Sequence, residues 1–318
     1  MSYPAEIAHG IMFHHFHNER HYKGGGSISK EDFERILHFV GLERIIEPNE
    51  WIKRINAGQL MAEDICITFD DALLSQFEIA LPVLEKYRIK AFWFVYSDVF
   101  EGHLNKLEIY RFFRYNFFNN IDDFYDLFFT RVSSLKFRDR IRTIVNETNI
   151  ADYLKRYPFY SINDIKFRLV RRALSEEEYE TIMDEMIKER GISLTKISKN
   201  LWMSNDHLKE LTKRGHLVGL HSYSHPMAMS DLSFKEQWQE YNLNYNHLNR
   251  VCGKPPIAMA HPANSYNNNT FQILKRLGIQ CGFRSDMFPP KGKRLNPSRY
   301  EIARDDHANI IRIINSNK

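Results

Sequence analysis

The stretch ICITFDD at residues 65–71 decides the fold class of this chain. Its first five residues are mostly apolar and two carboxylates follow them, which is typical of a short buried strand with acids at its carboxyl end. Because successive side chains of a strand point to opposite faces, Asp70 and Asp71 can serve different purposes at one place. One acid can ligate a metal ion while its neighbour does something else.

A second segment, HSYSHP at residues 221–226, supplies two imidazoles four residues apart. This spacing brings His221 and His225 together on a helical turn or a tight loop. One carboxylate with two histidines suits zinc or a similar divalent ion, and three protein ligands leave positions open for water. The two segments together predict a metal site of the catalytic type, assembled from distant parts of the chain.

Strand and helix patterns alternate on both sides of these segments. Serines that can cap a first helical turn, such as Ser29, Ser204 and Ser233, mark the helix starts. Short apolar runs that predict strands fall at residues 8–13, 65–69, 91–95, 217–220, 257–260 and 281–284. The alternation predicts an α/β fold with a parallel sheet, which we expect to be curled into a distorted (β/α) barrel.

The alternation stops between about residues 102 and 200, where apolar side chains follow helical spacing and strand patterns are scarce. We therefore expect a single barrel domain over residues 1–318, interrupted by a helical insertion at about 102–200. The insertion is either a lid or an element through which copies of the chain form a homo-oligomer.

The composition fits a protein with a substantial core, since the 318 residues are 43% hydrophobic and 14% aromatic. The formal net charge is only +4 and the basic residues are dispersed among acids, so nucleic acid is not expected as a partner. The three cysteines have no CxxC spacing, which favours reduced thiols. Neither a secretory signal nor a transmembrane segment is evident in the sequence, so we expect a cytoplasmic protein.

Polar side chains follow several of the predicted strands. His14 comes after the first strand and His261 after the strand at 257–260. The two acids follow the strand at 65–69, and His221 follows the strand at 217–220. In (β/α) barrels, catalytic groups gather at the carboxyl ends of the strands. A single histidine at such a position is more often structural, whereas the two acids together with His221 and His225 favour a functional site.

The pair of motifs TFDD at 68–71 and HSYSHP at 221–226 resembles the first two signature motifs of the polysaccharide deacetylases, the carbohydrate esterases with the NodB homology fold. The resemblance covers roughly residues 8–100 and 200–315. It implies that Asp71 and the two histidines hold a divalent metal, with Zn²⁺ expected and Co²⁺, Ni²⁺ or Mn²⁺ as alternatives. It also implies that the neighbouring acid, Asp70, is the general base that takes a proton from the attacking water.

The third signature of the family departs from its usual form in the segment MAHPANSYN at 259–267. The turn is retained, but Ala260 and Ala263 stand where the family has an arginine and an aromatic residue. The positive charge that orients the general base must then come from elsewhere. Arg304 is the first candidate and Arg284 the second.

The resemblance also implies a late histidine that acts as the acid. His307 fits this role, and His261 is the alternative. As candidate substrate-binding residues we take His14, Tyr223, Asn264 and Tyr266.

The sequence thus predicts a metal-dependent hydrolase that removes an N-acetyl group from an amino sugar in a glycan, nucleotide-sugar or lipid-linked precursor. The altered third motif suggests an atypical cytoplasmic subgroup linked to bacterial surface-glycan biosynthesis. A deformylase of a lipid-linked amino sugar would use the same chemistry on another acyl group. A catalytically silent glycan-binding protein on the same fold, or an assembly partner in a glycan-synthesis complex, are alternatives from other classes.

Overall fold

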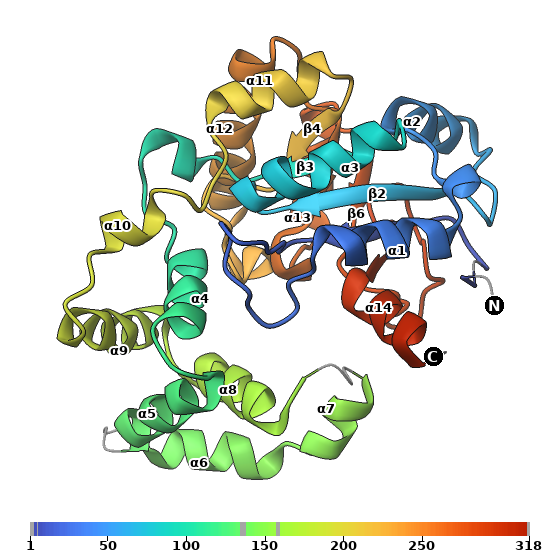
Figure 1. Ribbon diagram of the computed structural model, residues 1–318. Helices are drawn as coiled ribbons and strands as arrows, with labels where there is room; N and C mark the ends of the chain where they lie inside the picture. The colour runs from blue at the N-terminus through green and yellow to red at the C-terminus, as the bar shows by residue number, and fades with distance from the viewer. Residues whose placement is uncertain (1–2, 5, 134–137, 157–159, 317–318) are drawn as a thin grey trace. The chain divides into compact units, whose positions relative to one another are not determined.

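The computed structural model describes residues 3–4, 6–133, 138–156 and 160–316 (Figure 1). The chain divides into two compact units, which we call the barrel unit and the helical unit. The barrel unit comprises Met1–His21, Ser27–Asn105 and Asn200–Lys318. The helical unit comprises Lys106–Lys199 together with the short segment Tyr22–Gly26, which the sequence analysis did not connect with it.

Seven parallel strands form the centre of the barrel unit, in the order β6-β5-β4-β3-β2-β1-β7. Their bounds are β1 His9–Phe13, β2 Ile65–Asp70, β3 Phe92–Val95, β4 Leu217–Leu220, β5 Ala258–Ala260, β6 Cys281–Phe283 and β7 Arg304–Asp306. The backbone just before β7 pairs with β6, because the N–H of Ile302 donates to Gly282 at 2.9 Å and Arg284 donates to Ile302 at 2.7 Å. This pairing nearly closes the sheet, so the predicted distorted (β/α) barrel is confirmed.

The six strands predicted from the sequence are all present, but β7 is an additional strand. Its residues, Arg304–Asp306, are all charged and give no apolar pattern, so propensity alone does not identify it. It is held in place by parallel pairing with β1, in which Gly10 lies opposite Arg304 and Met12 opposite Asp306.

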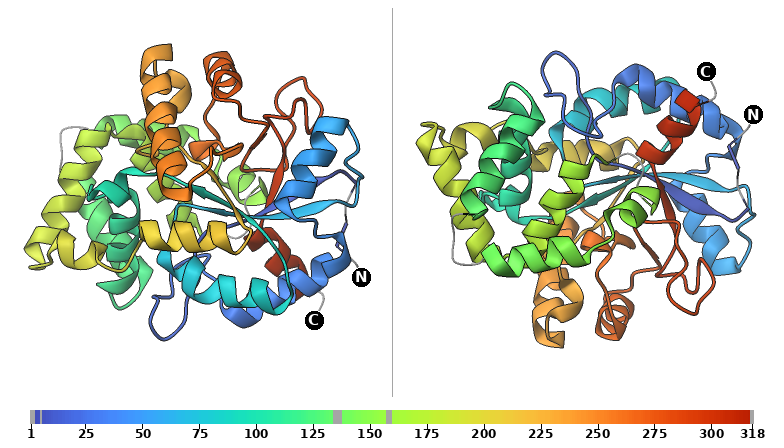
Figure 2. Two further views of the ribbon diagram at one scale, coloured as in Figure 1. Left: turned by 90° about the horizontal axis from the view of Figure 1, so that it is seen from above. Right: turned by 90° about the horizontal axis from the view of Figure 1, so that it is seen from below.

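Helices of the barrel unit surround the strands, as the views in Figure 2 show. They are α1 Lys30–Val40, α2 Pro48–Ala57, α3 Leu81–Lys86, α11 Asn205–Lys213, α12 Phe234–Cys252, α13 Asn268–Arg276 and α14 His307–Ser316. The predicted caps are confirmed, since Ser29, Ser204 and Ser233 each accept a hydrogen bond from the backbone N–H three residues later. α1 and α3 run alongside β2 (Figure 1).

Alternation along the strands divides the core into two parts. On β2 and β3, Phe69 and Trp93 face the surrounding helices and stack with ring centroids 4.2 Å apart. Phe92 and Phe94 point the other way and pack with Phe283 inside the barrel. Because Asp70 follows Phe69 in the alternation, its side chain is directed to the inside of the barrel.

The helical unit contains α4 Lys106–Asn116, α5 Ile121–Ser133, α6 Arg138–Glu147, α7 Ile150–Arg156, α8 Ile162–Ala173, α9 Glu176–Glu189 and α10 Leu194–Ser198. Its core is aromatic: Phe124, Phe128 and Phe167 are buried and pack with ring centroids 4.9 to 5.7 Å apart. Within the described ranges of the whole chain, no helix is both long and apolar enough to cross a membrane.

Candidate metal centre and active site

Asp71, His221 and His225 come together just beyond the carboxyl ends of β2 and β4. One ligand atom from each residue lies within 4.8 Å of the others. Oδ1 of Asp71 is 3.4 Å from Nε2 of His221 and 3.6 Å from Nε2 of His225. These separations are longer than ordinary hydrogen bonds and suit donor atoms gathered around an ion.

The backbone around the three residues is folded tightly. Asp71, Ser222 and His225 have positive φ values of 76°, 66° and 59°. Non-glycine residues rarely adopt this conformation, and surrounding bonds must hold it in place. The N–H of Asp71 donates to Phe94 at 3.1 Å, and the N–H of His225 donates to Oγ of Ser222 at 3.1 Å.

α12 positions the loop that carries the two histidines. The carboxylate of Glu240 accepts hydrogen bonds from the backbone N–H groups of Tyr223 and Ser224 at 3.0 and 2.9 Å, and from the Ser224 hydroxyl at 2.8 Å. Asn244 accepts from the N–H of His221 and donates to the carbonyl of Val95, both at 3.0 Å. The sequence analysis missed both residues, although polar side chains on the inner face of an amphipathic helix could have indicated them.

The donor set fits a divalent cation. Nδ1 of His221 lies 2.9 Å from the carbonyl oxygen of Ala260, so the proton belongs on Nδ1 and the lone pair of Nε2 faces Asp71. Oδ1 of Asp71 is buried and has no hydrogen-bond partner among the described residues. A buried, unpaired carboxylate oxygen beside two imidazole nitrogens is costly unless a cation bridges them.

The electrostatic environment favours an ionised Asp71 and a neutral His225, which are the protonation states that bind a metal ion. Burial would raise the pKa of Asp71, but the neighbouring imidazoles of His221, His14 and His225 outweigh burial and lower it. Burial lowers the pKa of His225 to about 4. Burial also acts to lower the pKa of His221, but the carboxylates of Asp70 and Asp71 outweigh burial and raise it.

Asp70 is held by Arg304 in a buried, bidentate ion pair. The two terminal nitrogens of Arg304 lie 2.7 Å from Oδ1 and Oδ2 of Asp70. Burial would raise the pKa of Asp70, but Arg304 and His221 outweigh it and lower the pKa, so the carboxylate stays ionised. Gly10 provides the space, because a Cβ there would lie 3.0 Å from Cγ of Arg304.

Arg284, the second candidate for this role, is committed elsewhere. Its guanidinium donates to the carbonyl oxygens of Glu301, Phe288 and Leu295 and to the carboxylate of Asp286 at 2.7 to 3.2 Å. Its own carbonyl oxygen accepts from Nε of Arg304 at 2.6 Å. Arg284 therefore supports the arginine that contacts Asp70 and does not contact the acid itself.

The family model described as polysaccharide deacetylase matches residues 177–282 of this chain. The matched range includes His221 and His225, while Asp70 and Asp71 lie outside it. This part of the chain is similar to a polysaccharide deacetylase domain. A search of curated proteins gives no match.

Solved structures of deacetylases share the fold of this chain. The deacetylase PplD of Streptococcus pyogenes, solved with acetate, is 15% identical with a TM-score of 0.55, over 95% of this chain and 93% of that one. IcaB of Ammonifex degensii is 14% identical with a TM-score of 0.55, over 96% and 93%. The BpsB deacetylase domain of Bordetella bronchiseptica is 11% identical with a TM-score of 0.52, over 95% and 97%. At these identities the likeness shows the fold alone.

The two histidines considered as the acid, His307 and His261, have different surroundings. His307 is the first residue of α14, directly after β7, with Nδ1 3.2 Å from the carbonyl oxygen of Met12 and its ring stacked on Phe13. His261 is 1% exposed, and its Nε2 lies 2.7 Å from the carbonyl oxygen of Tyr300. Burial lowers the pKa of His261 to about 3, so it stays neutral near pH 7.

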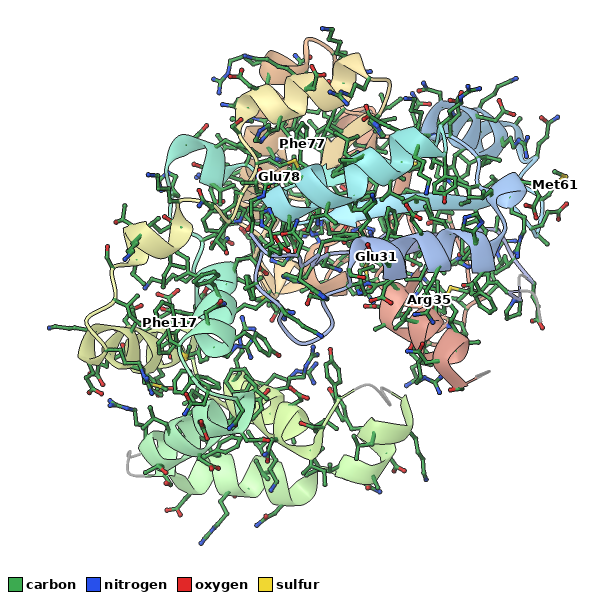
Figure 3. All side chains as sticks on the ribbon, viewed as in Figure 1. Glu31, Arg35, Met61, Phe77, Glu78 and Phe117 are labelled. Atoms are coloured by element: carbon green, nitrogen blue, oxygen red, sulfur yellow. The ribbon has the colours of Figure 1, made fainter. Side chains whose placement is uncertain are left out.

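Of the candidate substrate-binding residues, His14 lies beside the two acids. Its Nε2 is 3.8 Å from Oδ2 of both Asp70 and Asp71, and its side chain is 25% exposed. Gln76 fixes this edge by donating to the carbonyl oxygens of His14 and Asp70 at 2.7 and 2.6 Å. On the same short helical segment, Glu78, which Figure 3 labels, lies 2.9 Å from His21 and holds the end of the loop after β1.

The other three candidates use their polar groups within the protein. The hydroxyl of Tyr223 donates to Glu101 at 2.8 Å. The amide of Asn264 donates to Asp286 at 3.0 Å and accepts from the N–H of Ser285 at 3.2 Å. Tyr266 stacks on His261 with centroids 4.2 Å apart and points its hydroxyl at Glu301, 3.3 Å away. The polar groups of these three side chains are therefore engaged within the barrel unit.

Proposed function

We propose that this chain is a metal-dependent N-deacetylase that hydrolyses the acetamido group of an amino sugar in a glycan, nucleotide-sugar or lipid-linked precursor. The observation that carries the proposal is that the two adjacent acids, Asp70 and Asp71, have different hydrogen-bond partners. Asp71 faces two imidazoles with an unpaired oxygen, whereas both oxygens of Asp70 are bound by Arg304. The first arrangement suits a metal ligand and the second an oriented, ionised base.

A divalent ion held by Asp71, His221 and His225, which we take to be Zn²⁺ with Co²⁺, Ni²⁺ or Mn²⁺ as alternatives, would acidify a water and polarise the amide carbonyl. Asp70 then accepts a proton from the attacking water on a free lone pair of its carboxylate. Arg304 keeps that carboxylate ionised and fixes its direction, so the base needs no reorganisation during attack.

His307 is the proposed acid. Its Nδ1 lies 3.2 Å from the carbonyl oxygen of Met12, and its imidazole would carry a proton to the leaving amine. His261 is the weaker alternative, because its Nε2 is already engaged with Tyr300. We propose His14 as a contact for the acyl group or for sugar hydroxyls, with Tyr223, Asn264 and Tyr266 around it.

The replacement of the family arginine supports turnover over mere glycan binding. In the third motif Ala260 stands where the arginine is expected, but Arg304 supplies the charge from β7. A protein that only binds glycans has no use for an arginine that orients a base. We also propose a cytoplasmic location, a barrel domain that spans the chain with the helical unit as its insertion, and association of copies through that unit.

Acyl release tests this function directly. The purified chain, loaded with zinc or cobalt, should release acetate from N-acetylated sugar conjugates in a panel of glycans, nucleotide sugars and lipid-linked sugars. Formate release from the matching N-formyl compounds, without acetate release, would favour the deformylase instead. Binding across the panel without any release would reject hydrolysis.

A further inference from the structure

Residues 201–203 of the barrel unit pair with the chain that directly follows the two acids. The N–H of Met203 donates to the carbonyl oxygen of Ala72, and the N–H of Leu74 donates to the carbonyl oxygen of Leu201, both at 2.8 Å. The residues at the centre of the two segments form an antiparallel bridge. We call residues 201–203 the brace.

The turn that carries the acidic ligand depends on contacts of this kind. Asp71 and Ala72 are consecutive non-glycine residues with positive φ values of 76° and 56°. Such a conformation persists only where the surrounding structure fixes it. Because the brace binds the carbonyl oxygen of Ala72, it stabilises the turn that directs Asp71 toward the two imidazoles.

The side chain of Trp202, the central residue of the brace, reaches toward the loop with the two histidines. Its Nε1 donates to the hydroxyl of Tyr96 at 2.5 Å. Tyr96 is fully buried and directly follows β3. Its ring lies edge-on to the imidazole of His225, with centroids 5.6 Å apart and an angle of 64° between the planes. This packing restricts rotation of the ligand ring.

The backbone next to Tyr96 is bonded to the same histidine loop. The N–H groups of Ser97 and Asp98 both donate to the carbonyl oxygen of Tyr223 at 3.0 Å. The position of the Tyr96 ring is therefore fixed relative to the backbone between His221 and His225.

The brace is itself anchored by α11, which follows it directly. Ser204 caps this helix, and Leu208 and Leu211 bury its inner face completely. The ring of His207 stacks on Phe77, which Figure 3 labels, with centroids 4.3 Å apart. The brace therefore has a fixed base that does not depend on a bound ion.

We propose that Trp202 is a positioning residue of the metal centre. The brace holds the turn after Asp71, and the indole holds the ring of His225 through Tyr96, so one short segment sets the separation of ligands from two different strands. Ligand distances in a metal site stay within about 0.2 Å of their usual values, and contacts outside the ligands strongly affect metal affinity. This inference rests on the proposed metal centre and adds a residue outside its ligands.

Zinc affinity and the visible absorption spectrum of bound cobalt, measured on the full chain, test the positioning role. Trp202→Phe and Tyr96→Phe each remove one partner of the same hydrogen bond and keep an aromatic ring. We expect each variant to bind zinc about tenfold more weakly than the parent and to change the cobalt spectrum, which reports coordination geometry. The double variant should stay within about threefold of the weaker single variant, because both substitutions remove one shared bond.

Trp51→Phe is the matched control, because Trp51 is a buried residue of α2 whose Nε1 has no hydrogen-bond partner among the described residues. It should lower the unfolding temperature, yet keep zinc affinity within about twofold of the parent and leave the cobalt spectrum unchanged. Parental affinity and spectrum in Trp202→Phe and Tyr96→Phe, or an equal loss in Trp51→Phe, would overturn the positioning role alone. A parent protein that binds neither ion would overturn the metal centre together with it.

Discussion

Removal of the arginine that contacts the proposed base gives a prediction whose size follows from the structure. In Arg304→Gln, the carboxylate of Asp70 loses two charge-assisted hydrogen bonds of 2.7 Å at a fully buried position. Bonds to charged groups contribute about 1.5–3 kcal/mol each, which gives a loss of about 3–6 kcal/mol.

Protonation limits this loss. Without Arg304, Asp70 can bind a proton at pH 7 instead of remaining as an unpaired buried charge. Protonating a carboxyl whose pKa in the unfolded chain is about 3.9 costs about 4 kcal/mol at pH 7, which sets an upper bound on the loss of stability. Breaking a buried ion pair typically costs about 3–5 kcal/mol, which agrees with both bounds. We therefore expect Arg304→Gln to lower the free energy of unfolding by about 3–5 kcal/mol.

Urea unfolding of metal-free protein measures this change. The partner variant Asp70→Asn and the double variant complete a cycle, in which the neutral amide no longer needs the guanidinium. The cost of the double variant should fall short of the sum of the single costs by about 2 kcal/mol or more. A loss below about 1 kcal/mol for Arg304→Gln, or simple additivity, would refute the reasoning that this pair is tightly coupled.

Two further predictions concern groups around the site and at the opposite end of the barrel. Glu240→Gln removes the charge that holds the loop between the ligand histidines, so zinc affinity should fall about 10–100-fold in a competition titration. Glu236→Gln, at the start of α12, should leave zinc affinity unchanged; an equal loss in both variants would assign the effect to the helix as a whole. Burial lowers the pKa of His216 to about 3, and its Nδ1 accepts from the N–H of Ala91 at 3.1 Å. Since an unfolded histidine titrates near about 6.5, the unfolded state binds more protons below that pH, and stability falls as the pH falls. Lowering the pH from 7.5 to 5.5 should therefore reduce the free energy of unfolding by about 1.4 kcal/mol through His216 alone. In His216→Gln this part of the pH dependence should disappear. Identical pH dependence of the unfolding free energy in the two proteins would contradict the assignment.

The barrel could be predicted because its strands and caps are local signals. The apolar runs and the serine caps each depend on a few neighbouring residues, so they can be recognised without knowledge of the tertiary structure. β7 could not be predicted in this way, because Arg304–Asp306 forms a strand only through pairing with β1. The charge of Arg304 can be buried there because it forms an ion pair with Asp70 inside the barrel.

The residues of the candidate site also fall into those that local patterns indicate and those that only tertiary contacts identify. Adjacent acids and two histidines four residues apart are short-range patterns, and they indicated Asp71, His221 and His225 together. The choice between Arg304 and Arg284 depends on which guanidinium can reach the barrel interior, and on the space that Gly10 leaves. That information lies in the packing of β1 against β7.

Other contacts leave little trace in the sequence. Glu240 and Asn244 are ordinary polar residues of a long helix until α12 is placed against the histidine loop.

Metal content and acetate release, measured on the same samples of Asp70→Asn and Asp71→Asn, test the division of labour between the two acids most directly. The account predicts that Asp70→Asn keeps the metal of the parent protein and loses acetate release by about 10²-fold or more. It predicts that Asp71→Asn loses the metal itself. An Asp70→Asn protein that remains fully active, or an Asp71→Asn protein that retains the metal while Asp70→Asn loses it, would contradict the account.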